Sequence, residues 1–255
     1  MMAHATRRQM VTGLAGISLA GLLMDSKRVA EAASGLETVI TQASGTQVMA
    51  SLALPALTPA GAVVLIHEWW GLNDQIKAVA SEVAGLGYIA LAIDLYGGNV
   101  ATNPGEANKY MLAVDPAMAR ATMSAWVDWL RARPDCTGKV ASIGWCFGGG
   151  MSLQAALDRP LEGAIVYYGN VERRAEELSA LKGPVLGQFA TRDQWINPAM
   201  VAGFERAMKS AGKSLEDYSY EADHAFANPT GQNYDAEDAR TAWDRTVAFL
   251  EQVLG

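Results

Sequence analysis

The chain is poor in the residues that most often carry metal, redox and acid–base chemistry. Its 255 residues include only two cysteines and three histidines, and charged residues make up 18% of the chain. Two cysteines cannot form a disulfide framework or a four-cysteine zinc site. Because the only histidines are His4, His67 and His224, a reaction that needs an imidazole has very few candidates.

Basic charge is scarce as well. The chain has 20 lysines and arginines against 27 aspartates and glutamates, which gives a formal net charge of −7. A nucleic-acid partner needs a basic surface, so we expect no such partner. Half of the residues are hydrophobic, which is ample for a core and excludes a disordered chain. The length fits one α/β domain better than two domains.

Residues 1–33 differ from the rest of the chain. Arg7 and Arg8 precede an apolar run over 10–24, and Ala30-Glu31-Ala32 is a small-x-small cleavage pattern. The run contains three glycines and is shorter than the roughly 20 apolar residues of a membrane span. These features resemble a twin-arginine export signal. They predict a periplasmic protein without stable membrane anchoring after cleavage; the alternative is a cytoplasmic protein with a non-functional leader.

From residue 34 to residue 255, short apolar runs alternate with stretches of helical period. Runs typical of strands cover 36–41, 47–54, 63–66, 88–93, 140–143, 164–168, 185–189 and 215–220. The spacing of apolar residues predicts helices over 74–86, 117–132 and 236–253. Repeated strand–helix units indicate a single α/β domain. We expect a mostly parallel central sheet with helices on both faces, in three layers.

One cysteine stands between glycines where a predicted strand meets a predicted helix. Gly144-Trp145-Cys146-Phe147-Gly148 follows the run over 140–143 directly. In a sharp strand-to-helix turn, flanking glycines are needed because side chains would collide there. Such a turn exposes a nucleophile beside a helix N-terminus, which favours a thiolate and the oxyanion that it creates. We therefore predict that Cys146 is a nucleophile; a buried structural cysteine is the alternative.

A thiol nucleophile needs a base and an acidic group that orients the base. In folds with this turn, the acid and then the histidine follow the nucleophile along the chain, each after a later strand. Asp193 follows the run over 185–189, and His224 follows the run over 215–220. We predict that Cys146, Asp193 and His224 act together. The alternatives are a helix cap for Asp193 and an ordinary loop position for His224.

The segment His67-Glu68-Trp69-Trp70-Gly71-Leu72-Asn73 follows another predicted strand. In this fold the corresponding loop supplies an oxyanion donor, so we predict the backbone N–H groups of Trp69 and Phe147 as the two donors. A carboxylate normally suppresses a neighbouring thiolate, so Glu68 is useful only as a base that acts when substrate arrives. A solvated loop acid is the alternative. Side chains predicted to line the substrate pocket are Trp70, Trp145, Trp195, Phe226 and Asn228.

Together these residues resemble the dienelactone hydrolase family, the carboxymethylenebutenolidases. The resemblance covers about residues 36–253, through His67–Asn73, Asp94-Leu95-Tyr96, Gly144-Trp145-Cys146-Phe147-Gly148-Gly149, Asp193 and His224-Ala225-Phe226. It implies an α/β-hydrolase fold, no cofactor or metal, and hydrolysis of a small lactone or ester through an acyl-cysteine. It also implies catalytic roles for Cys146, Asp193 and His224, with Glu68 ionising the thiol once substrate binds.

The chain departs from the family at one position that bears on the substrate. Family members that act on dienelactone hold its carboxylate with arginines, one of them shortly after the histidine, and here Asn228 stands where that arginine is expected. Lys109 and Arg120 are the nearest basic candidates for the other arginine, with Arg192 a further possible cation. An asparagine amide offers only neutral hydrogen bonds. We therefore expect neutral esters or lactones to be preferred.

Two other functions remain open from the sequence. One is a general carboxylesterase with a neutral, apolar substrate, which the predicted tryptophans would suit. The other is a non-catalytic extracytoplasmic protein that binds a small molecule in the same pocket. In each case we expect a monomer or a small homo-oligomer.

Overall fold

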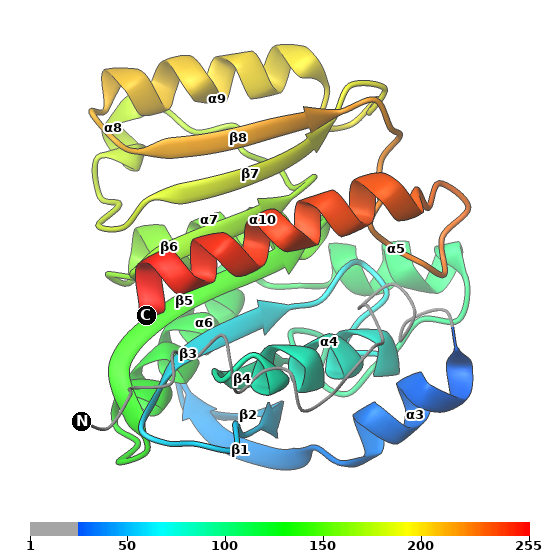
Figure 1. Cartoon of the computed structure of the whole chain (residues 1–255), viewed down its shortest axis with the longest axis vertical. Helices are drawn as coiled ribbons and strands as arrows, with labels where there is room; N and C mark the ends of the chain where they lie inside the picture. The colour runs from blue at the N-terminus through cyan, green and yellow to red at the C-terminus, as the bar shows by residue number, and fades with distance from the viewer. Residues whose placement is uncertain (1–24) are drawn as a thin grey trace, which may run out of the picture.

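The computed structural model describes residues 25–255, which form an eight-stranded sheet between two layers of helices (Figure 1). In spatial order the strands are β1 (Glu37–Ala43), β2 (Thr46–Ala53), β4 (Ile89–Ile93), β3 (Ala60–Ile66), β5 (Cys136–Trp145), β6 (Gly163–Tyr167), β7 (Val185–Ala190) and β8 (Leu215–Tyr220). The pairs β1–β2 and β2–β4 are antiparallel, and all other pairs are parallel. The predicted, mostly parallel sheet is confirmed.

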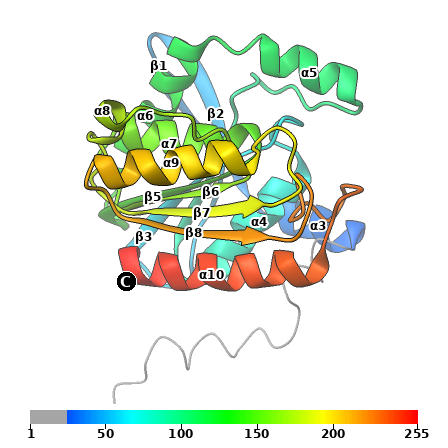
Figure 2. The ribbon, with the colours of Figure 1, turned by 90° about the horizontal axis from the view of Figure 1, so that it is seen from above.

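Helices cover both faces of this sheet (Figure 2). One face carries α6 (Pro116–Arg131), α7 (Phe147–Asp158), α8 (Ala175–Leu178) and α9 (Pro198–Ser210), with α5 (Pro104–Leu112) on the same side. The other face carries α3 (Ser26–Ser34), α4 (Asp74–Gly85) and α10 (Ala236–Leu254). Because both faces are covered, β3 and β4 are buried along their whole length, as their continuous apolar sequences predict.

Two of the differences from the sequence-based expectation have a simple physical cause. β5 begins at Cys136, four residues before the predicted run. The sequence does not predict these first residues because Cys136–Lys139 alternates between half-buried and exposed positions. This stretch therefore lacks the continuous apolar signal of a buried strand. The sequence does not predict helix α5, since Ala107 is its only buried residue and no apolar face marks it.

Helix α3 lies across the predicted boundary between leader and domain. Its Ala33 is buried, and the Ala32 carbonyl oxygen accepts a hydrogen bond from Ser81 Oγ of α4 at 2.8 Å. The paired arginines and the apolar run over 10–24 lie outside the described residues, so the export signal stays a prediction. Within residues 25–255, we find no helix of the length and apolarity that a membrane crossing requires.

Candidate active site

Cys146 occupies a strained turn between β5 and α7. Its backbone angles are φ 53° and ψ −116°, in a region that side chains other than glycine rarely adopt. The neighbouring glycines make the turn possible, because a Cβ atom on Gly144 would lie 1.9 Å from the Gly148 carbonyl oxygen. A Cβ atom on Gly148 would lie 2.2 Å from the carbonyl oxygen of Ile66. The sequence-based expectation that this turn needs glycines is thus explained by close backbone contacts at Gly144 and Gly148.

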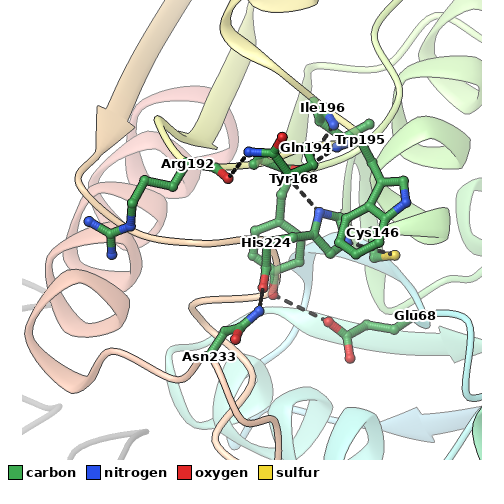
Figure 3. A network of polar contacts seen from close by, with 10 residues as sticks. Glu68, Cys146, Tyr168, Arg192, Gln194, Trp195, Ile196, His224 and Asn233 are labelled. Atoms are coloured by element: carbon green, nitrogen blue, oxygen red, sulfur yellow. Dashed lines mark hydrogen bonds and ion pairs between the residues drawn. The ribbon is translucent and has the colours of Figure 1, made fainter.

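The thiol, the imidazole and the carboxylate predicted to act together form one continuous line of contacts, and Figure 3 labels the thiol and the imidazole. His224 Nε2 lies 3.2 Å from Cys146 Sγ, and His224 Nδ1 lies 2.6 Å from Asp193 Oδ2. The other carboxylate oxygen of Asp193 accepts hydrogen bonds from the backbone N–H groups of Trp195 and Ile196. Asp193 therefore anchors its own loop with one oxygen and orients His224 with the other.

The charges of these groups are set by their contacts. Burial alone would lower the pKa of His224, but the hydrogen bonds to Asp193 and Cys146 and the charges of both groups raise it to about 10. Burial alone would raise the pKa of Asp193, but its bond to His224 and the backbone N–H groups lower it. The geometry therefore favours a protonated imidazole between a carboxylate and the sulfur atom.

Glu68 lies in the same site but binds other partners. Its carboxylate accepts a hydrogen bond from Tyr168 Oη at 3.3 Å and another from Asn228 Nδ2 at 2.5 Å. Burial raises its pKa to about 7, against the lowering effects of the His224 charge and the two hydrogen bonds. Glu68 is thus a buried acid held by neutral donors.

His67 has a structural place beside the site. It is fully buried, its Nδ1 lies 2.6 Å from the Glu68 carbonyl oxygen, and its Nε2 accepts a hydrogen bond from the Leu95 N–H at 3.2 Å. Burial lowers its pKa, so the ring is neutral and ties the loop after β3 to the loop after β4.

A cavity of about 820 Å³ opens beside Cys146. Trp69 and Phe147 belong to its wall. In the loops and turns of the described chain, their backbone N–H groups donate to no backbone carbonyl. Free N–H groups at this wall are what oxyanion donors require, and the assignment of Trp69 and Phe147 to that role stays a prediction. Of the predicted pocket side chains, Trp70, Trp195 and Asn228 also line the cavity.

Two predicted pocket residues lie elsewhere, which corrects the sequence-based interpretation. Trp145 is the last residue of β5 and points to the opposite face of the sheet, where it lines a second cavity of about 370 Å³ that shares Glu68 and Tyr168 with the first. Phe226 is fully buried in the core, with its ring 5.4 Å from Tyr168 and 4.8 Å from Tyr220 between centroids. Phe226 supports the site from behind.

Tyr168 is the functional residue that sequence reasoning missed. It follows β6 directly, has a left-handed φ of 36°, and places its ring 5.2 Å from the ring of His224. Its hydroxyl donates to Glu68, so it joins two parts of the site. Its position at the end of the strand next to β5 was the available signal, since carboxyl ends of adjacent parallel strands meet at one edge.

In the described part of the chain, no group of three His, Cys, Asp or Glu side chains is placed to hold a metal ion. The chemistry that the arrangement offers is nucleophilic. A cysteine sulfur whose proton is held by the neighbouring imidazole can attack a carbonyl carbon, and free N–H groups nearby can stabilise the resulting oxyanion.

Known proteins show the same combination of fold and sequence. A model of the dienelactone hydrolase family matches residues 48–254. A Saccharolobus solfataricus protein, provisionally named a carboxymethylenebutenolidase, is 32% identical, covering 84% of this chain and 98% of that protein. A carboxymethylenebutenolidase from Pseudomonas sp. strain P51 is 28% identical, with 80% and 90% covered.

Solved structures agree with this relationship. A Klebsiella pneumoniae structure, provisionally named a dienelactone hydrolase, aligns with a TM-score of 0.77 and 26% identity, covering 86% of this chain and 99% of the other. With the family match over most of its length, this chain belongs to the dienelactone hydrolase family, has the α/β-hydrolase fold, and is a carboxylic ester hydrolase.

Proposed function

We propose that the enzyme hydrolyses small lactones or carboxylic esters through an acyl-cysteine intermediate. The observation that carries the proposal is the line of contacts from Cys146 Sγ to His224 Nε2 at 3.2 Å and from His224 Nδ1 to Asp193 Oδ2 at 2.6 Å. Such a line lets an imidazole take a proton from the nucleophile and return it to the leaving group.

The proposed reaction has two steps. The Cys146 sulfur attacks the carbonyl carbon, the ester C–O bond breaks, and the imidazolium of His224 gives its proton to the leaving alkoxide. A water molecule then attacks the thioester while His224 accepts one of its protons; the C–S bond breaks, which releases the carboxylic acid and restores the thiolate beside the imidazolium. The N–H groups of Trp69 and Phe147 would stabilise the oxyanion in each step, and one such donor is typically worth about a hundredfold in turnover.

Glu68 stands outside this line of contacts. Both of its oxygens are engaged, one by Tyr168 and one by Asn228. For Glu68 to ionise the thiol, as the family resemblance implies, these bonds would first have to break. The direct contact between Cys146 and His224 supports His224 as the base of the resting enzyme instead.

We further propose a preference for substrates without a carboxylate next to the scissile bond. Asn228 is buried, and its amide already donates to Glu68. An amide is also neutral, so this position offers no cation to a small carboxylated lactone such as dienelactone, whose carboxylate lies within a few bonds of the ester. The difference between a charge-assisted and a neutral hydrogen bond corresponds to about tenfold in affinity.

A general carboxylesterase is the second candidate, and the size of the cavity favours it. About 820 Å³ lies in the upper part of the range for pockets that hold drug-sized ligands. Trp69, Trp70 and Trp195 give this cavity aromatic walls, which suit a larger apolar ester. Relative rates on simple lactones and on longer alkyl esters decide between the two.

The test combines a substrate panel with variants of the nucleophile. We expect wild-type enzyme to hydrolyse p-nitrophenyl esters and neutral lactones faster than dienelactone. Cys146→Ala should abolish turnover while leaving the melting temperature almost unchanged, and Cys146→Ser should be severely impaired because a hydroxyl is much less acidic than a thiol. Mass spectrometry of quenched reactions should show the acyl group on Cys146. Normal turnover by Cys146→Ala would overturn the mechanism.

A further inference from the structure

The substrate cavity extends well beyond the reacting groups, along one face of α7. Phe147, Gly150, Met151 and Gln154 all line it, and their spacing of three, four and seven residues defines one side of a helix. Gln154 lies eight residues after Cys146, which corresponds to about 12 Å along a helix axis. The cavity therefore runs about two turns of α7 away from the thiol.

Two arginines, Arg120 and Arg173, belong to the wall of this cavity. Arg120 is already neutralised, because its Nε and Nη2 donate to the two carboxylate oxygens of Asp158 at 2.8 and 2.5 Å. Arg173 is held differently: Nη1 donates to the Glu172 carbonyl oxygen at 2.9 Å and Nη2 to Gln154 Oε1 at 3.4 Å. In the described chain, Arg173 forms no ion pair with a carboxylate.

Gln154 fixes the place of Arg173 in the wall. Gln154 Nε2 donates to Asp158 Oδ1 at 3.0 Å, so its oxygen is turned toward Arg173. The guanidinium of Arg173 therefore lies near the end of the α7 face, about two turns from Cys146, with donors left for a ligand.

The other charged groups leave this positive charge uncompensated. Glu68 belongs to the other end of the cavity and is engaged by Tyr168 and Asn228. Arg192, a cation considered from the sequence, pairs with Asp223 at 3.2 Å and does not line the cavity. Lys109 is exposed and also lies outside the cavity wall. The charge of Arg173 contributes to lowering the pKa of Glu177, but the ion pair and hydrogen bonds of that carboxylate are with Arg174.

We propose that Arg173 binds an anionic group, such as a carboxylate, at the far end of an elongated ester substrate. This inference rests on the proposed hydrolase function and adds a substrate class to it: esters that carry a carboxylate about two helical turns from the scissile carbonyl. A small carboxylated lactone does not reach Arg173 while its ester lies at Cys146. The enzyme can therefore prefer substrates that are neutral near the scissile ester and also prefer substrates that carry an anion at their far end.

The test uses monoesters of straight-chain dicarboxylic acids with p-nitrophenol, from the short succinate to the long sebacate. Each acid is paired with its methyl-capped, neutral counterpart, and the ratio of their kcat/KM values measures the preference for the anion. A second series, ω-carboxyalkyl acetates of the same lengths with their methyl-capped forms, carries the anion in the alcohol part and is followed by pH-stat.

For the long esters of at least one series, we expect Arg173→Gln to lower the ratio about tenfold, mainly through KM, because charge-assisted hydrogen bonds are lost. Short esters should show no such change, Arg173→Lys should retain part of the ratio, and added salt should reduce it. Arg174→Gln is the matched control, since Arg174 is 78% exposed and lies outside the cavity wall.

Equal ratios in wild type and Arg173→Gln for the long esters of both series would overturn the inference. Circular dichroism and melting temperature check that the variants are folded, and Arg173→Lys provides a second folded variant for the comparison. Cys146→Ala is assayed on the neutral esters in parallel. Hydrolysis by that variant would refute the proposed mechanism, whereas an unchanged ratio with an inactive Cys146→Ala would refute only the role of Arg173.

Discussion

At the residue scale, the contact between Cys146 and His224 supports the proposal that His224 is the base of the resting enzyme. The imidazole lies 3.2 Å from the sulfur, whereas the carboxylate of Glu68 is held by Tyr168 and Asn228. A cation beside a cysteine stabilises its thiolate, which is the reactive form. Alkylation of the thiol therefore reports which group activates it.

We predict that His224→Ala slows the reaction of Cys146 with iodoacetamide at pH 7 at least tenfold, while Glu68→Gln changes it much less. Peptide mass spectrometry separates Cys146 from Cys136, and burial raises the pKa of the Cys136 thiol, so this second cysteine serves as a slow internal reference. If Glu68→Gln slowed alkylation more than His224→Ala did, Glu68 would be the activating base and His224 would act only later.

Glu68 also makes the stability of the protein depend on pH. Its pKa rises from an ordinary value of 4.5 to about 7 in the fold, where burial disfavours the charge. Below pH 4.5 the group is protonated in both the folded and the unfolded state. Between pH 4.5 and 7 the unfolded chain loses the proton first, so the free energy of unfolding falls as the pH rises. The total loss is about 3 kcal/mol.

Glu68→Gln cannot ionise, so its stability relative to wild type should rise by about 3 kcal/mol between pH 4 and pH 8. Urea unfolding at both pH values measures the difference, and the exposed Glu251→Gln is the control that should show almost no change. A constant difference between Glu68→Gln and wild type across this range would mean that the fold leaves the pKa of Glu68 unshifted.

At the scale of elements, the junction of β5 and α7 depends on atoms of β3 and its following loop. The Gly148 Cα approaches the carbonyl oxygens of Ile66 and His67 so closely that a Cβ atom would lie 2.2 and 2.5 Å from them. These are backbone atoms of the last residue of β3 and of the loop that follows it, and they cannot move aside without disturbing the end of the strand. The same close approach presents the Cys146 side chain to the cavity.

Gly148→Ala should therefore destabilise the protein by about 3 kcal/mol or more, or prevent folding. Gly203→Ala is the matched control, because Gly203 lies inside α9 and a Cβ atom there would have the end of the Arg206 side chain, at 3.8 Å, as its nearest neighbour. That variant should gain about 0.5–1 kcal/mol from helix propensity. Equal melting temperatures for the two variants would contradict the account of the turn.

At the scale of the whole molecule, the N-terminal segment and the domain meet at α3. Cleavage after Ala32, the site predicted from the sequence, would remove most of this helix and leave Ser81 without the Ala32 carbonyl oxygen as acceptor. The domain keeps its sheet, its site and its cavity, none of which uses a residue of α3. We propose that the protein is exported folded to the periplasm and processed there.

A fusion of residues 1–35 to a reporter that functions only after folded export should be active in the periplasm. Replacing both arginines, in Arg7→Lys/Arg8→Lys, should abolish that export, and Arg28→Lys should not affect it. N-terminal sequencing of the mature enzyme checks the cleavage position. Periplasmic signal that is indifferent to Arg7 and Arg8 would contradict the twin-arginine route, and absence of any signal would place the enzyme in the cytoplasm.

Much of the molecule follows from the sequence by itself, because the features concerned are local. Continuous apolar runs marked β3 and β4, since strands buried on both faces need apolar residues at every position. The spacing of glycines around Cys146 marked the turn, because backbone crowding there admits no side chain. The order of Asp193 and His224 after later strands placed them at the same edge as Cys146.

Only the tertiary structure decided what the side chains at that edge contact. Asn228, expected to face the substrate, binds Glu68 from 160 residues away in the chain. Trp145 and Phe226 point away from the cavity, because the alternation of β5 and the packing behind Tyr168 set their directions. Arg173 is held at the cavity wall by its hydrogen bond to Gln154 of α7. Such contacts join loops from separate strands, and their geometry exists only once the sheet has brought the loops together.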